Sequence, residues 1–358
     1  MAQLVTEATP EPVVTEVIGG IDTHADTHTV AALDQIGRLL GTATFPATLP
    51  GFRDLTEWLR AHGRCVRVGV EGTGSYGMAL TQHLQAGGII VSEVNRPDRS
   101  ARRARGKDDP TDALSAARAV LAEDRIATPK DHTGPAEAIR NVLCSYNLMV
   151  KQRAHLQTQF KSLLVTAPET IRATLKRHNT AKMIATAARY RPNTDDLTRP
   201  EQAVKLALQA IAHQHQSLTA TITDLHKTLD RLTRQQRPDL RAQLGYGPIN
   251  TAQLICTYGD NPDRIHSEAA FAKLCGTAPI AASSGKTVRH RLNRGGDRQA
   301  NCAIHTIMLT RLRHDPRTRA YRDRRTAEGK SKRDAYRCLK RFITREIYNY
   351  LSQPPTTP

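Results

Sequence analysis

The residues best suited to chemistry lie in residues 106–113, where three carboxylates occur within five positions beside a basic segment. Asp109 and Asp112 are three residues apart, and Pro110 is typical of the first turn of a helix. In a helix that begins there, both carboxylates lie on one side and repel each other. A bound divalent cation is the usual reason for such a pair, and hard oxygen ligands suit Mg²⁺ or Mn²⁺. The same two acids are equally typical of a helix N-terminus, where the dipole favours negative charge.

Two more acids stand at the ends of predicted strands. Residues 17–22 and 66–71 are short apolar runs that end at Asp22 and Glu71. Further strands are predicted at residues 29–33, 38–45 and 88–94, and helices at residues 51–62, at residues 75–84 and from Pro110 onward. Three strands followed by alternating helices and strands are typical of an α/β domain of the ribonuclease-H-like class, a mixed sheet covered by helices.

These acids are expected to form one site, because ligands and metals gather at the strand ends of such a sheet. The four predicted metal ligands are Asp22, Glu71, Asp109 and Asp112. Each acid by itself is also typical of a turn, a strand end or a helix N-terminus. Four acids in this order of elements are much less expected by chance, so the set favours a divalent metal centre.

Two neighbouring groups leave the ligand set partly open. Asp108 directly precedes Asp109 and could be the metal ligand in its place. The three-residue helical spacing between Asp109 and Asp112 favours Asp109. His24, Asp26 and His28 lie close to Asp22 in the sequence and offer an alternative set of zinc ligands. Zinc is disfavoured because no further His/Cys cluster occurs in the chain.

The charge of the chain points to a polyanionic partner. The formal net charge is +18 and the pI is near 10. Residues 311–346 contain 14 Lys/Arg against 5 Asp/Glu, so half of the net charge lies there. Such an excess favours nucleic acid over a membrane surface, because no basic amphipathic anchor stands out at either terminus.

The remaining composition favours a cytoplasmic, nucleoid-associated protein. No apolar run approaches the roughly 18 residues of a membrane span, and residues 1–16 carry no signal pattern and are expected to form a flexible tail. The six cysteines are scattered without a CxxC pair, which disfavours a zinc site or a disulfide framework.

The second half of the chain is predicted to be mainly helical. Residues 136–166 and 201–232 have apolar side chains at helical spacing, which predicts an antiparallel hairpin or coiled coil that separates domains or dimerises the protein. We therefore expect a catalytic domain at residues 17–130, a helical linker region at residues 131–239 and a C-terminal domain at residues 240–358.

Glycines mark one candidate phosphate-binding turn and one further loop in the C-terminal region. Residues 244–254 combine a Gly-x-Gly-Pro turn with a following helix, which can present backbone N–H groups to a DNA phosphate or can serve as a plain interhelix turn. Residues 276–286 form a loop that contains Ser283 and Ser284, and a basic strand at residues 287–292 follows. Helices are expected at residues 300–313 and 331–351.

Taken together, these motifs resemble a known family. Asp22, the segment 70–76, the Lys-x-Asp-x-x-Asp-Ala segment at residues 107–113 and the loops at residues 276–286 and 294–298 occur in the order found in the DEDD transposases of insertion sequences related to the Piv invertase. Members of that family have a RuvC-like N-terminal domain and a C-terminal transposase domain with a serine. The resemblance covers nearly the whole chain.

The resemblance implies a specific chemistry. The four acids bind divalent metal, and a serine attacks a backbone phosphorus and forms a covalent phosphoserine link to DNA. A serine hydroxyl is a weak nucleophile that needs a base or a metal, so the serine loop must come to the acid cluster, in the same or a partner chain. Ser284, beside Gly285, is the preferred nucleophile, and Ser283 is the alternative.

The resemblance also implies partners. Family members act on element ends and target DNA, in well-studied cases with a structured guide RNA, and the exchange of two strand pairs calls for a dimer or tetramer. Basic side chains near the two motifs are predicted to contact nucleic acid; they are Arg102, Arg103, Arg105, Lys107, Lys286, Arg289, Arg291, Arg294 and Arg298.

Two other functions compete with this one. A RuvC-like nuclease would use the acids alone and hydrolyse DNA with water. A nucleic-acid-binding protein without catalysis would show a decayed acid set. The complete set of four acids disfavours the binding protein, and the serine loop disfavours the nuclease.

Overall fold

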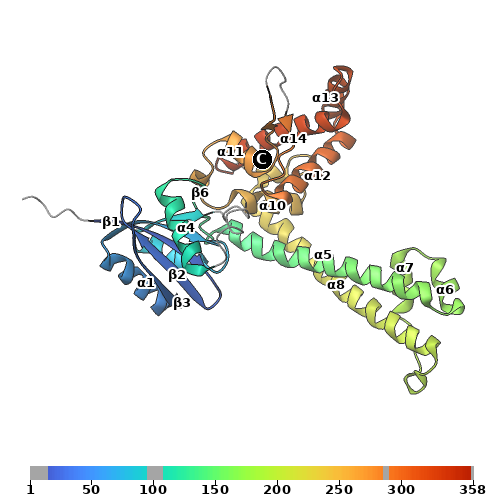
Figure 1. Ribbon diagram of the computed structural model, residues 1–358. Helices are drawn as coiled ribbons and strands as arrows, with labels where there is room; N and C mark the ends of the chain where they lie inside the picture. The colour runs from blue at the N-terminus through green and yellow to red at the C-terminus, as the bar shows by residue number, and fades with distance from the viewer. Residues whose placement is uncertain (1–14, 95–107, 285–289, 356–358) are drawn as a thin grey trace, which may run out of the picture. The chain divides into compact units, whose positions relative to one another are not determined.

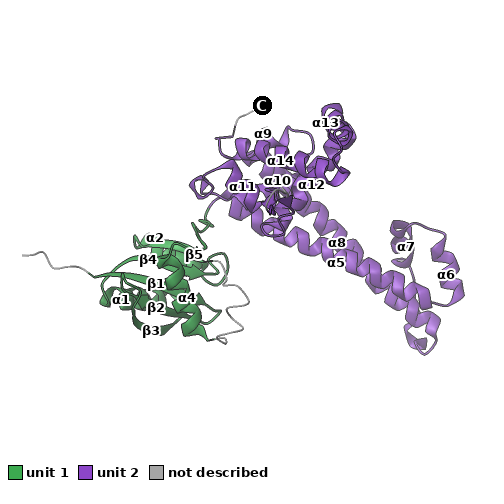
Figure 2. Ribbon diagram, turned by 45° about the horizontal axis from the view of Figure 1, so that its top comes forward, with its two compact units in different colours: residues 1–133 green, residues 134–358 purple. Residues whose placement is uncertain are grey.

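The structure is a computed structural model, and it describes residues 15–94, 108–284 and 290–355. The chain forms two compact units, residues 1–133 (unit 1) and residues 134–358 (unit 2), shown in Figure 2. Among the helices of the described residues, none has the length and apolar character needed to cross a membrane.

Unit 1 is a mixed six-stranded sheet with helices on both faces (Figure 1). Its strands are β1 (Glu16–Thr23), β2 (Thr27–Leu33), β3 (Leu39–Pro46), β4 (Arg64–Glu71), β5 (Ile90–Val94) and β6 (Ile126–Ala127), in the spatial order β3-β2-β1-β4-β5-β6. Strands β1, β4 and β5 run parallel, whereas β2, β3 and β6 pair antiparallel to their neighbours. The expected α/β class and the expected order of strands and helices are confirmed, and the two-residue β6 was not predicted.

Opposite faces of the sheet are covered by different helices. Helices α1 (Leu49–Ala61) and α2 (Met78–Ala86) pack on one face, where Ile21, Leu55 and Leu80 are fully buried. Helix α4 (Asp109–Leu121) packs on the other face through Ala116 and Val120. The apolar runs of β1 and β4 are continuous because both of their faces are covered.

Unit 2 is built around a long helical hairpin. Helix α5 (Pro135–Thr166) and helix α8 (Pro200–Gln236) pack along each other. Ile139 near the start of α5 shares a core with Leu229 near the end of α8, and Phe160 near the end of α5 shares another with Leu208 near the start of α8. The two helices are therefore antiparallel, as the sequence predicted.

The far end of the hairpin differs from the prediction. The sequence predicted no helix between residues 166 and 201, but the chain folds there into α6 (Glu169–Lys176) and α7 (Thr180–Ala187), which have their own buried core with α5 and α8. Each of these helices has eight residues, and two of them are buried. Two buried positions are too few to show a helical period in the sequence.

The base of the hairpin carries the main core of unit 2. Around it pack α9 (Pro238–Arg241), α10 (Pro248–Tyr258), α11 (Glu268–Leu274), α12 (Arg298–His314), α13 (Pro316–Ala327) and α14 (Lys332–Leu351). The strands β7 (Ile280–Ala281) and β8 (His290–Arg291) form a small antiparallel pair. Helix α13 was not predicted, because none of its residues is buried and its sequence has no apolar period.

Candidate metal centre

Strands β1 and β4 bring two of the predicted acids to the same edge of the sheet. Their parallel register pairs Ile21 with Val70, so Asp22 and Glu71 follow side by side where the two strands end. Both residues are buried, each 6% exposed. The hydroxyl of Thr23 donates to the backbone carbonyl of Glu71 at 2.8 Å and ties the two strand ends together.

Two glycines show which face these acids use. A Cβ at Gly20 would lie 2.1 Å from the backbone N of Ala117, and a Cβ at Gly69 would lie 2.5 Å from Val120 Cγ2, so both positions face α4 at close range. Side chains two residues apart on a strand share a face. Asp22 and Glu71 therefore lie on the α4 side, just beyond the glycines that let this helix approach.

The start of α4 supplies the other predicted pair. Asp108 precedes the helix, Asp109 and Pro110 open it, and the N–H of Asp112 donates to the Asp108 carbonyl at 3.0 Å. The Asp108 carboxylate accepts from the Thr111 hydroxyl at 3.4 Å. Asp108 thus serves the helix terminus, while Asp109 is half-exposed and Asp112 is buried at 5% exposure.

A histidine joins two of these acids. His24 Nε2 lies 3.1 Å from Asp22 Oδ2 and 3.4 Å from Asp109 Oδ1. One ligand atom from each of these three residues falls within 4.8 Å of the others. The structure therefore joins the end of β1 to the start of α4 through a compact group of possible metal ligands.

The electrostatics of Asp22 reflect this crowding. Burial raises the pKa of Asp22, the carboxylates of Asp112 and Asp109 raise it further, and His24 opposes the rise. Asp112 thus acts on Asp22 through space. Like charges held together in a partly buried site favour a divalent cation, and the oxygen and nitrogen donors present fit one.

The predicted acids therefore enter the centre in different ways. Asp22 and Asp109 belong to the close group, Asp112 lies within electrostatic range of Asp22, and Glu71 is placed at the same edge by the strand register. In the sequence, His24 was considered only as a zinc ligand, and zinc was disfavoured. Its spacing nevertheless indicated a position beside Asp22, because residues two positions apart lie on the same face of an extended chain.

The predicted serines lie in unit 2. Ser283 and Ser284 are exposed and follow β7 directly. Of the predicted nucleic-acid contacts, Arg291, Arg294 and Arg298 are exposed near these serines in the sequence. The others lie outside the described residues; they are Arg102, Arg103, Arg105, Lys107, Lys286 and Arg289.

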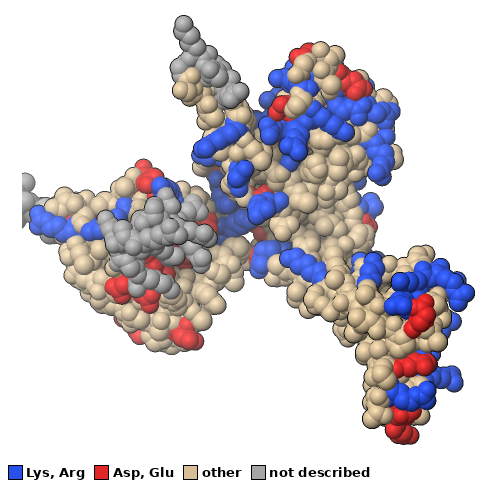
Figure 3. All heavy atoms as spheres, turned by 45° about the vertical axis from the view of Figure 1, so that its right-hand side comes forward, with Lys and Arg blue, Asp and Glu red and all other residues tan. Residues whose placement is uncertain are grey.

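The surface of unit 2 carries much of the positive charge. Figure 3 shows Lys and Arg side chains gathered over its C-terminal helices. Helix α13 alone contains Arg317, Arg319, Arg322, Arg324 and Arg325. Arg313 and Arg317 are exposed, whereas Arg325 is paired with Glu328. This distribution fits a surface that meets phosphates.

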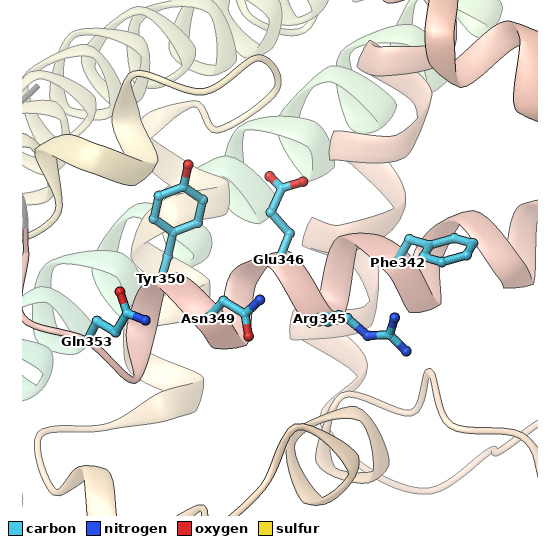
Figure 4. Close-up of a pocket in the computed structure, with 6 residues that line it drawn as sticks. All are labelled: Phe342, Arg345, Glu346, Asn349, Tyr350 and Gln353. Carbon is cyan, nitrogen blue, oxygen red and sulfur yellow. The ribbon is translucent and has the colours of Figure 1, made fainter.

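A shallow groove along α14 is lined by side chains of that helix and by Gln353, which follows it (Figure 4). Its acid, Glu346, accepts from Arg311 at 2.8 and 2.6 Å and from the buried Tyr246 hydroxyl at 3.1 Å. The Arg311 Nε–H also donates to the Leu244 carbonyl at 3.1 Å. Glu346 therefore holds the glycine turn before α10 in place, and the groove offers no separate chemistry.

Two family models match the chain. One, described as Transposase and named for the DEDD transposases of IS110, matches residues 19–167, and a second, described as Transposase IS116/IS110/IS902 family, matches residues 229–323. Both matched segments of the chain are thus similar to transposases of the IS110 type. The first match contains the whole acid centre, and the second contains both predicted serines.

Individual relatives agree with this family. The chain is 30% identical over 141 residues to "Insertion element IS110 uncharacterized 43.6 kDa protein" of Streptomyces coelicolor. This aligned region covers 39% of this chain and 33% of that protein. The chain is also 25% identical over 169 residues to "Insertion element IS900 uncharacterized 42 kDa protein" of Mycobacterium paratuberculosis. This aligned region covers 46% of this chain and 42% of that protein. The matches thus span less than half of the length of these relatives. These comparisons support the predicted insertion-element transposase family, and the relation to Piv stays a prediction.

Proposed function

We propose that this protein cuts and rejoins DNA strands at the ends of an insertion element and at its target. The observation that carries the proposal is the close group of Asp22, His24 and Asp109 at one edge of the unit 1 sheet, with Asp112 within electrostatic range of Asp22. Phosphoryl transfer needs positive charge held beside the reacting phosphate, and such a cluster of acids is suited to hold it as a metal ion.

The proposal includes a ribonuclease-H-like fold for unit 1. Three features support it: the antiparallel succession β1-β2-β3, the parallel strands β4 and β5 on the other side of β1, and the acids at the end of the central strand. The helix that covers the acid side of the sheet also begins with acids, as expected for a site shared between a strand end and a helix start.

Asp22, Glu71, Asp109 and Asp112 are the residues that would hold the metal. A bound Mg²⁺ or Mn²⁺ would polarise the phosphate and stabilise the leaving oxygen. The chain itself contributes the orientation of its carboxylates. The close packing of α4 on Gly20 and the pairing of β1 with β4 fix the two strand-end acids before any substrate arrives.

The covalent step is assigned to Ser284, with Ser283 as the alternative. The serine oxygen attacks a backbone phosphorus and gives up its proton to a base or to water, and the bond to the leaving nucleotide oxygen breaks. A phosphoserine link retains the energy of the broken diester for rejoining. The exposed position of both serines after β7, in the segment matched to the transposase family, supports the assignment. Exposed Arg291, Arg294 and Arg298 are proposed to bind phosphate.

We propose that the full reaction uses partners. Element-end and target DNA are the substrates, a structured guide RNA selects them, and a dimer or tetramer supplies enough centres for two exchanges. The net charge of +18 supports a nucleic-acid partner of either kind.

A nuclease of the RuvC type is the second candidate. The four acids lie within one unit, so unit 1 contains by itself all the groups that metal-dependent hydrolysis requires. Such an enzyme would release DNA ends by attack of water and would leave no protein attached to them.

One experiment separates the two candidates. The full chain is incubated with element-end DNA, Mg²⁺ and any element-encoded RNA, and a covalent protein–DNA adduct is sought under denaturing conditions. We expect an adduct in the wild type and in Ser283→Ala, and its loss in Ser284→Ala. Loss in Ser283→Ala alone would reassign the nucleophile to Ser283. Cleavage without an adduct in any of these proteins would contradict the serine mechanism and support the nuclease.

A further inference from the structure

We propose that His24 is a nitrogen ligand of the metal centre, so that the centre prefers Mn²⁺ to Mg²⁺. This inference rests on the proposed metal-dependent function and adds to the four acids a residue outside that set. It concerns both the ligand set and the class of cation that the centre accepts.

The distances around His24 match those between ligands of one ion. In an octahedral site with metal–ligand bonds of about 2.1–2.2 Å, adjacent ligand atoms lie roughly 3 Å apart. His24 Nε2 lies 3.1 Å from an Asp22 oxygen and 3.4 Å from an Asp109 oxygen. One ring nitrogen thus faces carboxylates from two different elements at the spacing that a shared cation requires.

The fold holds His24 in this position through the backbone. Thr23 is the last residue of β1 and pairs with His28, and the N–H of His24 donates to the Thr27 carbonyl at 3.0 Å. His24 therefore begins the tight turn between β1 and β2. Its side chain continues the face of Asp22, because residues two apart along an extended segment point the same way.

A counter-ion role alone leaves the charge of the site unbalanced. A neutral imidazole can donate only one proton through Nε2, although two carboxylates face this atom. Even a charged imidazolium would offset one unit, against the carboxylates of Asp22, Asp109 and Asp112 that interact here. A divalent cation satisfies both carboxylates and leaves the nitrogen lone pair as a donor.

The nitrogen donor has a consequence for selectivity. Imidazole suits the transition metals, whereas Mg²⁺ is bound mainly by oxygen ligands. A centre with His24 is therefore expected to bind Mn²⁺ more tightly than Mg²⁺. Replacement of His24 by aspartate would restore an all-oxygen set and reduce this preference.

The test uses Mn²⁺ as the probe and the full chain without substrate. Pulsed EPR of bound Mn²⁺ detects nitrogen-14 coupling from a directly coordinated imidazole, and calorimetry measures the affinities for Mn²⁺ and Mg²⁺. The proteins compared are the wild type, His24→Ala, His24→Asp and the control His83→Asn. His83 belongs to α2, on the face of the sheet opposite α4.

We expect nitrogen coupling in the wild type and in His83→Asn, and its absence in both His24 variants. His24→Ala should weaken Mn²⁺ binding at least tenfold, since loss of an outer-shell partner alone costs about 10- to 100-fold. His24→Asp should keep metal binding with a lower Mn²⁺ to Mg²⁺ ratio. Circular dichroism of each variant checks that it is folded.

Two results would overturn the inference in distinguishable ways. Bound Mn²⁺ without nitrogen coupling in the wild type, or coupling that persists in His24→Ala, would remove His24 from the ligand set and leave the acid centre intact. Failure of the wild type to bind Mn²⁺ or Mg²⁺ would overturn this inference together with the metal centre of the proposed function.

Discussion

At the scale of single residues, the carboxylates that are proposed to bind metal also destabilise the folded protein when no metal is bound. Burial and neighbouring carboxylates raise the pKa of Asp22, so the ionised carboxylate is less favourable in the folded protein without metal than in the unfolded chain. The contribution of Asp22 to the free energy of unfolding therefore falls as the pH rises above the ordinary pKa of an aspartate. Removal of the charge relieves that repulsion and removes a ligand at the same time.

We therefore expect Asp22→Asn to melt at a higher temperature than the wild type in EDTA at pH 7, by a few degrees. With Mn²⁺ the order should reverse, because a ligand that binds only the folded state stabilises it. Differential scanning calorimetry with and without metal measures both effects. Asp26→Asn, an exposed acid in the turn that follows, serves as the control. Equal melting of Asp22→Asn and the wild type in EDTA would contradict the proposed crowding.

Asp112 gives a second prediction at this scale, for activity. Asp112→Asn should lower strand cleavage at least about 100-fold, a loss comparable to that of one preorganised electrostatic group in other enzymes. DNA binding, measured by fluorescence anisotropy, should persist, because the mutation removes an acid and leaves every Lys and Arg of the protein in place. Full cleavage by this variant would remove Asp112 from the metal set.

At the scale of elements, the centre depends on how closely α4 approaches the sheet. Gly20→Ala would place a Cβ 2.2 Å from the Ala113 carbonyl oxygen, and this backbone atom cannot move without the helix. We expect a loss of about 1–3 kcal/mol or more in the free energy of unfolding of unit 1, with weaker Mn²⁺ binding. Urea unfolding and calorimetry measure the two quantities.

Gly87→Ala is the matched control for this prediction. Gly87 also lies in unit 1 and has a φ of −81°, and the nearest atom to an added Cβ there would be the Leu84 carbonyl oxygen at 3.4 Å. It should unfold like the wild type. Equal stability of Gly20→Ala and Gly87→Ala would show that α4 can shift without cost.

The sequence predicted those elements that have enough buried positions to show a period. Strands β1 to β5, helices α1, α4, α5, α8, α12 and α14, and the antiparallel hairpin could all be anticipated in this way. Helices α6 and α7 were too short, and α13 buries none of its residues, so its only local signals are Asp315 before the helix and Pro316 at its start. The spacing of His24 from Asp22 was visible in the sequence, but its approach to Asp109 arises only when β1 and α4 pack, which no local pattern reports.

At the scale of the whole molecule, charge governs the interaction with nucleic acid. Arg313 and Arg317 are exposed near the start of α13. The double change to Gln should weaken DNA binding at 0.1 M salt and lower the slope of log affinity against log salt by about 1.8, or about 0.9 for each phosphate contact. Anisotropy titrations at several salt concentrations measure the slope.

Arg325→Gln provides the comparison, because Arg325 is already paired with Glu328. Its slope should change less than that of either Arg313→Gln or Arg317→Gln. An unchanged slope in the Arg313/Arg317 double variant would place the DNA contact elsewhere on the protein.

The two cores of unit 2 predict separate stability at the two ends of the hairpin. Phe160→Ala removes a fully buried ring from the far core and should cost about 3–5 kcal/mol there. Hydrogen–deuterium exchange should rise in α6 and α7, while α10 and α12 at the base keep their protection. A uniform rise throughout unit 2 would show that the two cores unfold as one.

The hairpin also has a mechanical consequence. Helix α8 has 37 residues, and at 1.5 Å per residue it is about 55 Å long. At its base, the hairpin of α5 and α8 packs against α10. If the hairpin tilted by about 10° about this base, α6 and α7 at the far end would move by roughly 10 Å. Side-chain adjustments at the base are thereby amplified into a displacement as wide as a helix at the tip.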